Sequence, residues 1–582
     1  MLENSKIVEI ANGMVTLQLD LNIYEVDNLI GKNLTFVDND NRFIGEIANI
    51  KNNIASIYLL GYINNGKFIF GDLLKPPFNS KVYLTTAEEL DTIYSDDVTN
   101  LKIGTSYIYP KYKIGLDVNK FFSNHFAILG NTGSGKSYAV SSLIQKIFYE
   151  SESSPFKSNF FIFDAYGEYK NCFTEINKKF NNINYRLITT DLKSNNEHLA
   201  IPFYLLGVDD LALLLDAEEP KQIQVISKAL SLVSIFAQKE ENVIEYKNDI
   251  IARCLLDIIY NNDNLKIRTQ IVSILSKFYT KDIYLEKPLT RGGWTLSLKQ
   301  CLYINENGKI QDIELVCDYL EKFVKVNLDY NNAKIMYYTV EDFYVALEFA
   351  LISEGILSSD KVFDYANVLK VRLDTLIKGV NRNYFIYDEL IDKNEYICRL
   401  LMSSDNRKYQ IINFNINSLD DRFAKVIVKI LSKWLFDFTV SLEKRAKFPI
   451  HIILEEAHRY VQNDRDAKLL GYNIFDRIAK EGRKYGIILG LISQRPGELS
   501  EVTISQISNF LIFKMFHKQD LEFVGQVLPS IANYNIDRLK MLYPGVCMAT
   551  GSSFKMPTII KMDMPNPSPL SKNVDILKTW YN

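Results

Sequence analysis

One short segment places glycines, hydroxyl groups and a lysine at a spacing that suits phosphate. It reads Gly130-Asn131-Thr132-Gly133-Ser134-Gly135-Lys136-Ser137. The segment fits the phosphate-loop pattern G-x-x-x-x-G-K-[ST] without a mismatch. In such a loop, backbone N–H groups surround the phosphates, and the start of the following helix adds partial positive charge. We expect Lys136 to reach the β- and γ-phosphates of a nucleotide, and the Ser137 hydroxyl to hold Mg²⁺.

The segments around this loop have the order that the chemistry needs. Residues 125–129 form a short apolar run that predicts a buried strand, and residues 138–147 carry apolar side chains at helical spacing. A chance turn of glycine and serine before a helix is the alternative. With both flanks in place, the sequence predicts a strand, a nucleotide loop and a helix.

A first pair of carboxylates follows the apolar run 160–163. The run ends at Asp164, and Glu168 comes four positions later. A continuous apolar run is typical of a strand buried on both faces of a parallel sheet, and ligands sit at the carboxyl ends of such strands. We therefore expect Asp164 and Glu168 near the nucleotide, where a carboxylate could orient Mg²⁺-bound water. A simple acidic β-turn is the alternative.

A second pair of carboxylates, Glu455 and Glu456, follows the predicted strand 450–454. Two acids directly after a buried strand are costly unless they are paired or linked to a metal. In a nucleotide hydrolase, the first acid binds Mg²⁺ through water and the second polarises the attacking water. We assign these roles to Glu455 and Glu456 respectively, with Glu456 as the general base. The alternative is a surface acid pair that opens a helix.

Polar residues also stand at both ends of the predicted strand 486–493. Gln494, after the strand, could bind the γ-phosphate or the attacking water; the alternative is a polar loop. The basic segment 477–486 precedes the strand, and Arg483 is the best candidate to stabilise charge on the phosphoryl group of a neighbouring copy. The alternative is a helix end whose cations complement the helix dipole before a glycine. His125 and His458 have no metal-ligand spacing, so we expect hydrogen-bonded structural histidines.

Bulk properties limit the remaining possibilities. The chain has 582 residues, 47% hydrophobic and 24% charged, with a net charge of -3, which is an ordinary globular composition. There is no global basic footprint, so any nucleic-acid contact must come from a local patch or from a pore formed on assembly. The 6 cysteines form no C-x-x-C pair and suit a reducing cytosol. Without an apolar signal region or a run of ~20 apolar residues, we expect a cytoplasmic protein with no membrane contact.

The pattern along the chain predicts five parts. Short β-rich segments with Asn- and Gly-rich turns open the chain and favour a small barrel, with a generic sandwich as the alternative. Strands then alternate with helices, helical periodicity dominates the middle, and the alternation returns before a proline-containing end. The parts are a β-barrel (1–115), a first α/β core segment (116–205), a helical insertion (206–400), a second core segment (401–564) and a tail (565–582).

Taken together, these motifs resemble the HerA family of hexameric DNA translocases, within the HerA–FtsK group of RecA-like P-loop ATPases. The order, the spacing and the layout all match. The resemblance is carried by His125 to Ser137, Asp164-Ala165-Tyr166-Gly167-Glu168-Tyr169, Leu454-Glu455-Glu456-Ala457-His458, Glu481-Gly482-Arg483-Lys484-Tyr485-Gly486 and Ser493-Gln494-Arg495-Pro496. It implies an α/β fold: a RecA-like core, a small N-terminal β-barrel of the HAS type and a helical insertion domain.

Three departures from the family pattern stand out. The family usually has Asp-Pro-His-Gly-Glu-Tyr where this chain has Asp-Ala-Tyr-Gly-Glu-Tyr from position 164. Glu455 replaces the usual Asp. Asn124 stands where relatives often have an Arg that can act across a subunit interface, so that role would rest on Arg483 alone.

The resemblance also implies an assembly and partners. It predicts a ring of six with ATP and Mg²⁺ between neighbours, double-stranded DNA in the central pore, and an effector docked on the β-barrel ring. Archaeal relatives pair with a NurA nuclease, and many bacterial relatives pair with a nuclease or a sirtuin-like NAD-consuming protein in phage defence; the composition favours the bacterial type. One rival is a ring-shaped scaffold in which ATP is mainly structural. Another is a monomeric or dimeric nucleotide switch.

Overall fold

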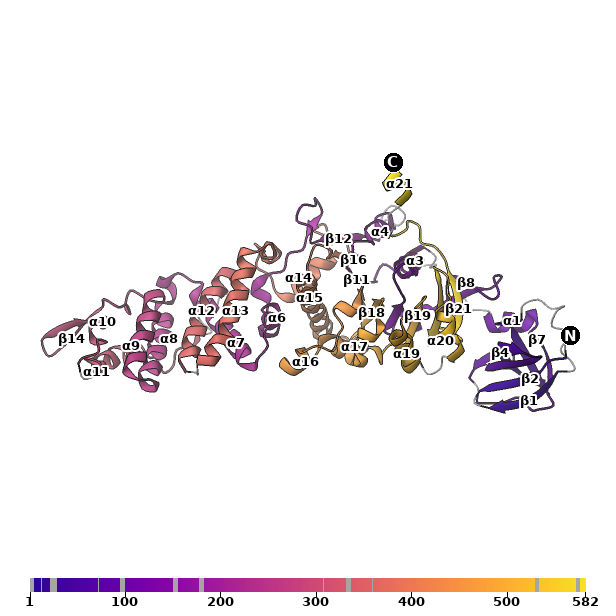
Figure 1. The fold of residues 1–582 in the computed structure, drawn as a ribbon. Helices are drawn as coiled ribbons and strands as arrows, with labels where there is room; N and C mark the ends of the chain where they lie inside the picture. The colour runs from indigo at the N-terminus through magenta and orange to yellow at the C-terminus, as the bar shows by residue number, and fades with distance from the viewer. Residues whose placement is uncertain are drawn as a thin grey trace. The chain divides into compact units, whose positions relative to one another are not determined.

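The computed structural model describes residues 5–11, 13–20, 29–71, 73–94, 100–149, 155–176, 183–306, 308–330, 337–357, 360–528, 533–571 and 576–581. The chain divides into two compact units (Figure 1). The core unit comprises Met1–Glu197, Ile397–Asp464 and Asn473–Asn582, and the helical unit comprises His198–Tyr396 and Arg465–Tyr472. The five sequence-based boundaries stay predictions, and the predicted tail lies partly outside the described residues.

An antiparallel sheet opens the core unit, drawn in indigo in Figure 1. Side chains on one face alternate into an apolar core, as along β5, where every second residue is buried. The strand order is β1-β2-β5-β4-β3-β7, with β6 beside β5. β1 and β7 end this order without pairing to each other in the described residues, so the predicted barrel is not confirmed. The strands are β1 (Lys6–Ala11), β2 (Met14–Gln18), β3 (Asn33–Asp38), β4 (Asn41–Lys51), β5 (Ile54–Asn64), β6 (Lys67–Phe70) and β7 (Lys81–Leu84).

The rest of the core unit is built on a 12-stranded mixed sheet, ordered β13-β12-β16-β11-β17-β18-β10-β19-β20-β21-β8-β9. The strands from β12 to β19 run parallel, and those from β20 onward pair antiparallel. Its strands are β8 (Asn100–Ser106), β9 (Lys113–Asp117), β10 (Phe126–Leu129), β11 (Phe160–Asp164), β12 (Tyr185–Thr189), β13 (Glu197–His198), β16 (Ile411–Asn415), β17 (Ile450–Leu454), β18 (Ile487–Ser493), β19 (Asn509–Ile512), β20 (Val546–Gly551) and β21 (Thr558–Met562).

The central strands of this sheet are buried along their whole length. Every residue of β10, β11, β17 and β18 is buried, as expected of parallel strands covered on both faces. The helices of this unit are α1 (Ala87–Tyr94), α2 (Val118–Phe122), α3 (Lys136–Tyr149), α4 (Lys170–Phe173), α15 (Asp421–Ser441), α17 (Ile474–Tyr485), α18 (Glu501–Ile504), α19 (Lys518–Val527), α20 (Asn533–Leu539) and α21 (Ile576–Tyr581). The α/β core predicted from the sequence is therefore present.

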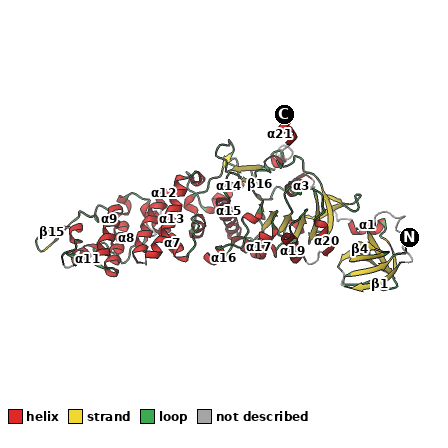
Figure 2. Ribbon diagram, in the orientation of Figure 1, coloured by secondary structure: helices red, strands yellow, loops and turns green. Residues whose placement is uncertain are grey.

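The helical unit consists mostly of helices, with one small hairpin (Figure 2). Its helices are α6 (Val208–Leu214), α7 (Pro220–Phe236), α8 (Glu240–Asn261), α9 (Asn264–Lys277), α10 (Leu298–Cys301), α11 (Ile313–Glu321), α12 (Val340–Leu357), α13 (Asp360–Lys378) and α16 (Asp466–Leu469), and α14 (Lys393–Leu401) leads back to the core unit. The hairpin pairs β14 (Pro288–Arg291) with β15 (Trp294–Ser297) around two glycines with positive φ. None of the described helices is long and apolar enough to cross a lipid bilayer.

Candidate functional site

The predicted site residues other than Arg483 lie along one edge of the large sheet. β11, β17, β18 and β10 are neighbours, and their carboxyl ends are nearly level, because Phe163 pairs with Leu454 and Leu129 pairs with Ser493. Asp164 is the last residue of β11, the Glu455–Glu456 pair and Gln494 follow β17 and β18, and the glycine loop follows β10. The topology thus brings together motifs that are more than 350 positions apart in the sequence.

The glycine loop has the backbone of a phosphate-binding turn. Gly130, Gly133 and Gly135 all have positive φ angles, of 153°, 72° and 112°, which side chains rarely tolerate. A Cβ at Gly130 would lie 2.6 Å from the Cβ of Phe513, so the loop has no room for a side chain there. α3 begins at Lys136. Hydrogen-bond donors are thus available to an anion at this helix start, where the helix dipole is positive.

Lys136 is the central cation of the site. The side chain is only 9% exposed, and its Nζ donates a hydrogen bond to the backbone oxygen of Asn131 at 3.1 Å. Burial lowers the pKa of Lys136, while the charges of Glu456, Glu455 and Glu168 raise it. A buried ammonium group at this position can donate charge-assisted hydrogen bonds to a phosphate group.

Asp164 holds the turn that follows β11. It is fully buried, and its oxygens accept the backbone N–H groups of Glu168 and Tyr169, both at 3.0 Å. The Oε2 atom of Glu168 is buried and has no hydrogen-bond partner in the described part of the chain. Asp164 therefore shapes the turn, and Glu168 is the acid of this pair with a free buried oxygen. Direct contact of either residue with a nucleotide stays a prediction.

Glu455 points back toward the end of β11. It is 4% exposed, and its Oε2 accepts the backbone N–H of Ala165 at 3.2 Å. Burial, helped by the charge of Asp164, raises the pKa of Glu455 well above its ordinary value. Among the described residues, no group of three or more His, Cys, Asp or Glu side chains could hold a metal ion alone. A magnesium ion here would need ligands from the nucleotide itself.

Glu456 has an unusual backbone and an unpartnered carboxylate oxygen. Its φ of 51° and ψ of 47° place it in the left-handed region, which is rare for residues other than glycine and is common at active sites. Its Oε2 is buried without a hydrogen bond among the described residues. Burial raises the pKa of Glu456, and the charges of Lys136 and Arg459 lower it. The result is a carboxylate more basic than an exposed one and free to accept a proton.

His458 lies closer to this chemistry than the sequence indicated. Its Nδ1 is 3.3 Å from Oε2 of Glu456 and 3.2 Å from Oγ of Ser493. Burial lowers the pKa of His458, so the ring is neutral near pH 7. The position two residues after Glu456 was the only signal in the sequence, and it did not distinguish a core histidine from a residue that orients Glu456.

Gln494 contacts the nucleotide loop directly. Its side-chain oxygen accepts a hydrogen bond from Oγ1 of Thr132, and one residue earlier the backbone oxygen of Ser493 accepts the N–H of Gly130 at 3.1 Å. A polar pocket of about 960 Å³ opens beside these residues. It is lined by Asn131, Thr132, Gln494, Arg495, Gly497, Glu498 and seven residues between 516 and 526, most of them on α19. The side chain of Gln494 is thus close enough to the loop for a bound phosphate group to change its contacts.

Arg483 lies at the opposite edge of the sheet from the loop of its own chain. It stands exposed in the last turn of α17, and β18 runs from there to Gln494, about 20 Å for a seven-residue strand. His125, at the start of β10, contacts the same helix through the backbone oxygen of Ala479 at 3.1 Å. The charge of Arg483 contributes to lowering the pKa of that histidine. Arg483 therefore cannot reach the nucleotide loop of its own chain.

His125 and a second buried histidine, His451, give the fold a testable pH dependence. Nδ1 of His125 accepts the N–H of Leu489 at 2.9 Å, and Nε2 of His451 is 2.8 Å from the backbone oxygen of Phe122. Burial lowers the pKa of both histidines from 6.5 to about 4. At a pH between these two pKa values, the histidines bind protons in the unfolded chain but not in the folded chain. The free energy of unfolding therefore falls as the pH drops from 6.5 toward 4. Urea unfolding at a series of pH values measures this slope.

The histidine variants separate this effect from general acid sensitivity. His451→Gln should reduce the slope, whereas His198→Gln at an exposed position should leave it unchanged. Equal slopes in the original protein and His451→Gln would contradict the assignment.

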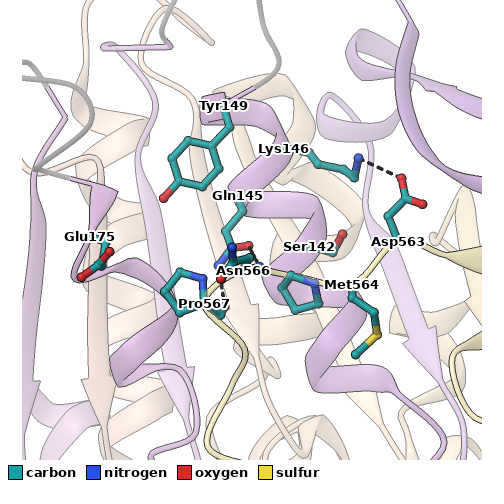
Figure 3. Close-up of a pocket in the computed structure, with 10 residues that line it drawn as sticks. Ser142, Gln145, Lys146, Tyr149, Glu175, Asp563, Met564, Asn566 and Pro567 are labelled. Carbon is teal, nitrogen blue, oxygen red and sulfur yellow. Dashed lines mark hydrogen bonds and ion pairs between the residues drawn. The ribbon is translucent and has the colours of Figure 1, made fainter.

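The segment after β21 is fastened to the helix of the nucleotide loop. The side chain of Gln145 on α3 donates to the backbone oxygen of Pro567 and accepts the N–H of Asn566, both at 2.8 Å, and Lys146 pairs with Asp563 at 3.0 Å (Figure 3). These residues line a pocket of about 570 Å³. The sequence indicated only a proline-rich end, because no local pattern identifies a contact between residues 422 positions apart.

The chain is similar to known proteins. Residues 101–286 match the family model described as "Helicase HerA, central domain". The chain is 23% identical over 512 residues to the DNA double-strand break repair helicase HerA of Pyrococcus furiosus. The alignment covers 88% of this chain and 77% of the relative. It is also 25% identical over 559 residues to the DNA double-strand break repair helicase HerA of Sulfolobus acidocaldarius. That alignment covers 95% of this chain and 86% of the relative.

One solved structure similar to the chain is VirB4 of Thermoanaerobacter pseudethanolicus. The TM-score is 0.46 with 12% sequence identity, and the alignment covers 80% of this chain and 97% of VirB4.

Proposed function

Because the chain belongs to the HerA family of P-loop ATPases, we propose that it is a hexameric, Mg²⁺-dependent ATPase that moves along double-stranded DNA. In this proposal it is the motor of a separately encoded effector, a nuclease or a sirtuin-like NAD-consuming protein, in phage defence or DNA-end processing. The observation that carries the proposal is the position of Arg483 at the edge opposite its own loop, which suits a site completed by a neighbouring copy.

The residues at the sheet edge fit ATP and Mg²⁺. The N–H groups of the loop and Lys136 would hold the phosphates, with Gly130, Asn131, Thr132, Gly133, Ser134 and Gly135 forming the cradle. Ser137, at the start of α3, would hold Mg²⁺ together with phosphate oxygens, and Glu455 would contact it through water. The magnesium ion neutralises charge on the phosphates when it is bound.

Glu456 is our general base. Its buried oxygen without a hydrogen bond and its raised pKa suit it to take a proton from a water molecule, and the neutral ring of His458 lies 3.3 Å from that oxygen. Gln494 would orient the same water or the γ-phosphate, and its contact with Thr132 links it to the loop. Proton acceptance by a positioned group is worth about 10²- to 10⁴-fold in rate.

A neighbouring copy would complete the site. The pocket of about 960 Å³ beside Gln494 leaves room for side chains from a second protomer. Arg483 of the neighbour would stabilise charge on the transferring phosphoryl group, an effect worth about 10³- to 10⁵-fold in other phosphoryl-transfer enzymes. In the proposed ring of six, DNA occupies the central pore and the effector docks on the N-terminal sheet.

One observation favours the rival, a ring-shaped scaffold with ATP as a mainly structural ligand. Asn124, at the position where relatives often carry an Arg, is 9% exposed and donates to the backbone oxygen of Lys120 at 2.7 Å. It therefore serves the local fold, and one route to catalysis across the interface is missing.

ATP-dependent movement along DNA distinguishes the motor from the scaffold. For a motor, we expect duplex DNA to stimulate ATP hydrolysis and hydrolysis to displace a third strand from a triplex substrate. The measurement is triplex displacement with ATP, with a non-hydrolysable ATP analogue as the control. Binding of DNA without ATP-dependent displacement would favour the scaffold.

A further inference from the structure

The amino ends of the central strands carry an unpaired basic surface, away from the nucleotide loop. Four segments meet there: residues 155–159, 405–410, 442–449 and 480–486, which precede β11, β16, β17 and β18. They carry nine cations. Arg407 is paired with Asp405, and Lys480 and Arg483 lie on α17 before its last two residues; the other six, which we call the basic edge, are Lys157, Lys408, Lys444, Arg445, Lys447 and Lys484. Five of the six are exposed, and Lys408 is half-buried.

Contacts between the segments show that the basic edge is continuous. Nε2 of Gln410 donates to the backbone oxygen of Phe156 at 2.9 Å, and Nδ2 of Asn159 donates to the backbone oxygen of Pro449 at 2.8 Å. Gly486 is packed so closely on Ala446 that a Cβ there would lie 2.9 Å from its Cα. The four strands are neighbours in the order β16-β11-β17-β18, so the edge is about 14 Å wide at ~4.8 Å per strand.

The cations of the basic edge lack acidic partners. None of the six forms an ion pair with another described residue, whereas the nearby acids Asp405 and Glu481 are already paired with Arg407 at 2.9 Å and Arg477 at 3.8 Å. Glu443 is the one acid on the 442–449 segment. In a chain whose net charge is -3, this local excess of positive charge attracts anions to the edge.

Aromatic rings hold three of these cations in place. Nζ of Lys408 lies 5.1 Å from the ring centre of Phe448, and Cζ of Arg445 lies 5.3 Å from that of Tyr485. Burial, and then the charge of Lys157, lowers the pKa of Lys408 from 10.5 to about 8. Lys157 itself lies 5.6 Å from the ring centre of Phe156. Cations ordered on rings and held close together form a fixed surface, more suited to a repeated anion than to a single carboxylate.

We propose that the basic edge binds the phosphate backbone of duplex DNA. This inference rests on the proposed function of the chain. Duplex DNA carries one negative charge per ~1.7 Å, so ~14 Å of its length presents about eight charges to the six cations. Cations outnumber the exposed acids Asp405, Glu443 and Glu481 on these segments. Phe156 is the large apolar side chain exposed there, at 55%, so these described segments lack the extended apolar centre that a protein partner would need. The contacts come from side chains that reach phosphates, so binding is independent of base sequence.

The test compares two sets of three charge reversals in the full-length protein. One variant combines Lys157→Glu, Lys444→Glu and Lys447→Glu, all exposed in the basic edge. The matched control combines Lys51→Glu, Lys67→Glu and Lys81→Glu, all exposed on the N-terminal sheet. Binding of a fluorescein-labelled duplex is measured by anisotropy over a salt series, with sedimentation and DNA-free ATP hydrolysis as checks of folding and assembly.

We expect the salt dependence of log Kd to lose a slope of about 2.7 in the basic-edge variant, at about 0.9 for each lost phosphate contact. The control should keep the original slope, and both variants should keep DNA-free hydrolysis. If the original protein binds duplex and the basic-edge variant binds it equally well, the proposal is wrong while the proposed function stands. If the basic-edge variant loses DNA-free hydrolysis but still binds DNA, the edge serves a neighbour's nucleotide, and the DNA-binding proposal is wrong. If the original protein binds no duplex at any salt concentration, both proposals fail.

Discussion

Lys136→Ala is expected to lower ATP hydrolysis by about 10³-fold, which corresponds to ~4 kcal/mol of lost transition-state stabilisation. The substitution removes a buried cation that faces three acids, Glu168, Glu455 and Glu456. Without it, a phosphate group would enter a site of net negative charge, so nucleotide binding should weaken as well. Steady-state hydrolysis and equilibrium binding of a fluorescent ATP analogue measure the two effects.

The control for this variant is Lys120→Ala. Lys120 also lies in the core unit, but its side chain is 60% exposed in an ion pair of 3.5 Å with Asp117, and such surface pairs contribute under ~1 kcal/mol. The control should hydrolyse ATP at the original rate. Normal hydrolysis by Lys136→Ala would refute the nucleotide site.

Glu456→Gln is expected to lower hydrolysis by about 10²- to 10⁴-fold while nucleotide binding and assembly persist. The amide has almost the same shape as the carboxylate, but it cannot accept the proton of the attacking water. The left-handed backbone at this position is held by the fold and does not require the charge. Hydrolysis, nucleotide binding and sedimentation together measure the outcome.

This variant also decides between motor and scaffold. A motor should lose triplex displacement and effector-dependent function with Glu456→Gln, whereas a scaffold should retain effector function. Glu501→Gln, exposed at the start of α18, is the control and should behave like the original protein. Retained effector function in Glu456→Gln would favour the scaffold.

The sheet edge could be predicted from the sequence because each motif marks a strand end. The buried strands are continuous apolar runs, and Asp164, Glu455 and Gln494 directly follow three of them, so their meeting at one edge follows from parallel topology. The roles of these residues stay predictions. For the N-terminal part, the short β-rich segments correctly indicated strands, but closure into a barrel depends on pairing between distant strands that local patterns do not determine.

Features that depend on tertiary contacts could not be predicted. The contact of His458 with Glu456 depends on a left-handed residue, and the turn held by Asp164 depends on which backbone N–H groups face its carboxylate. The basic edge is spread over four separate segments, one of them about 250 positions before the other three, so the near-neutral net charge concealed it. Only the strand order brings these lysines together.

We propose that ATP is hydrolysed at an interface that uses Lys136 of one protomer and Arg483 of another. The most direct measurement of this mixes two inactive variants, Lys136→Ala and Arg483→Ala, and follows ATP hydrolysis. In mixed rings, a protomer with intact Lys136 meets a neighbour with intact Arg483, so we predict that activity returns on mixing although each variant alone is inactive. A mixture of co-assembled variants that stays inactive, or an Arg483→Ala protein that hydrolyses ATP at the original rate, would show that hydrolysis does not use this interface.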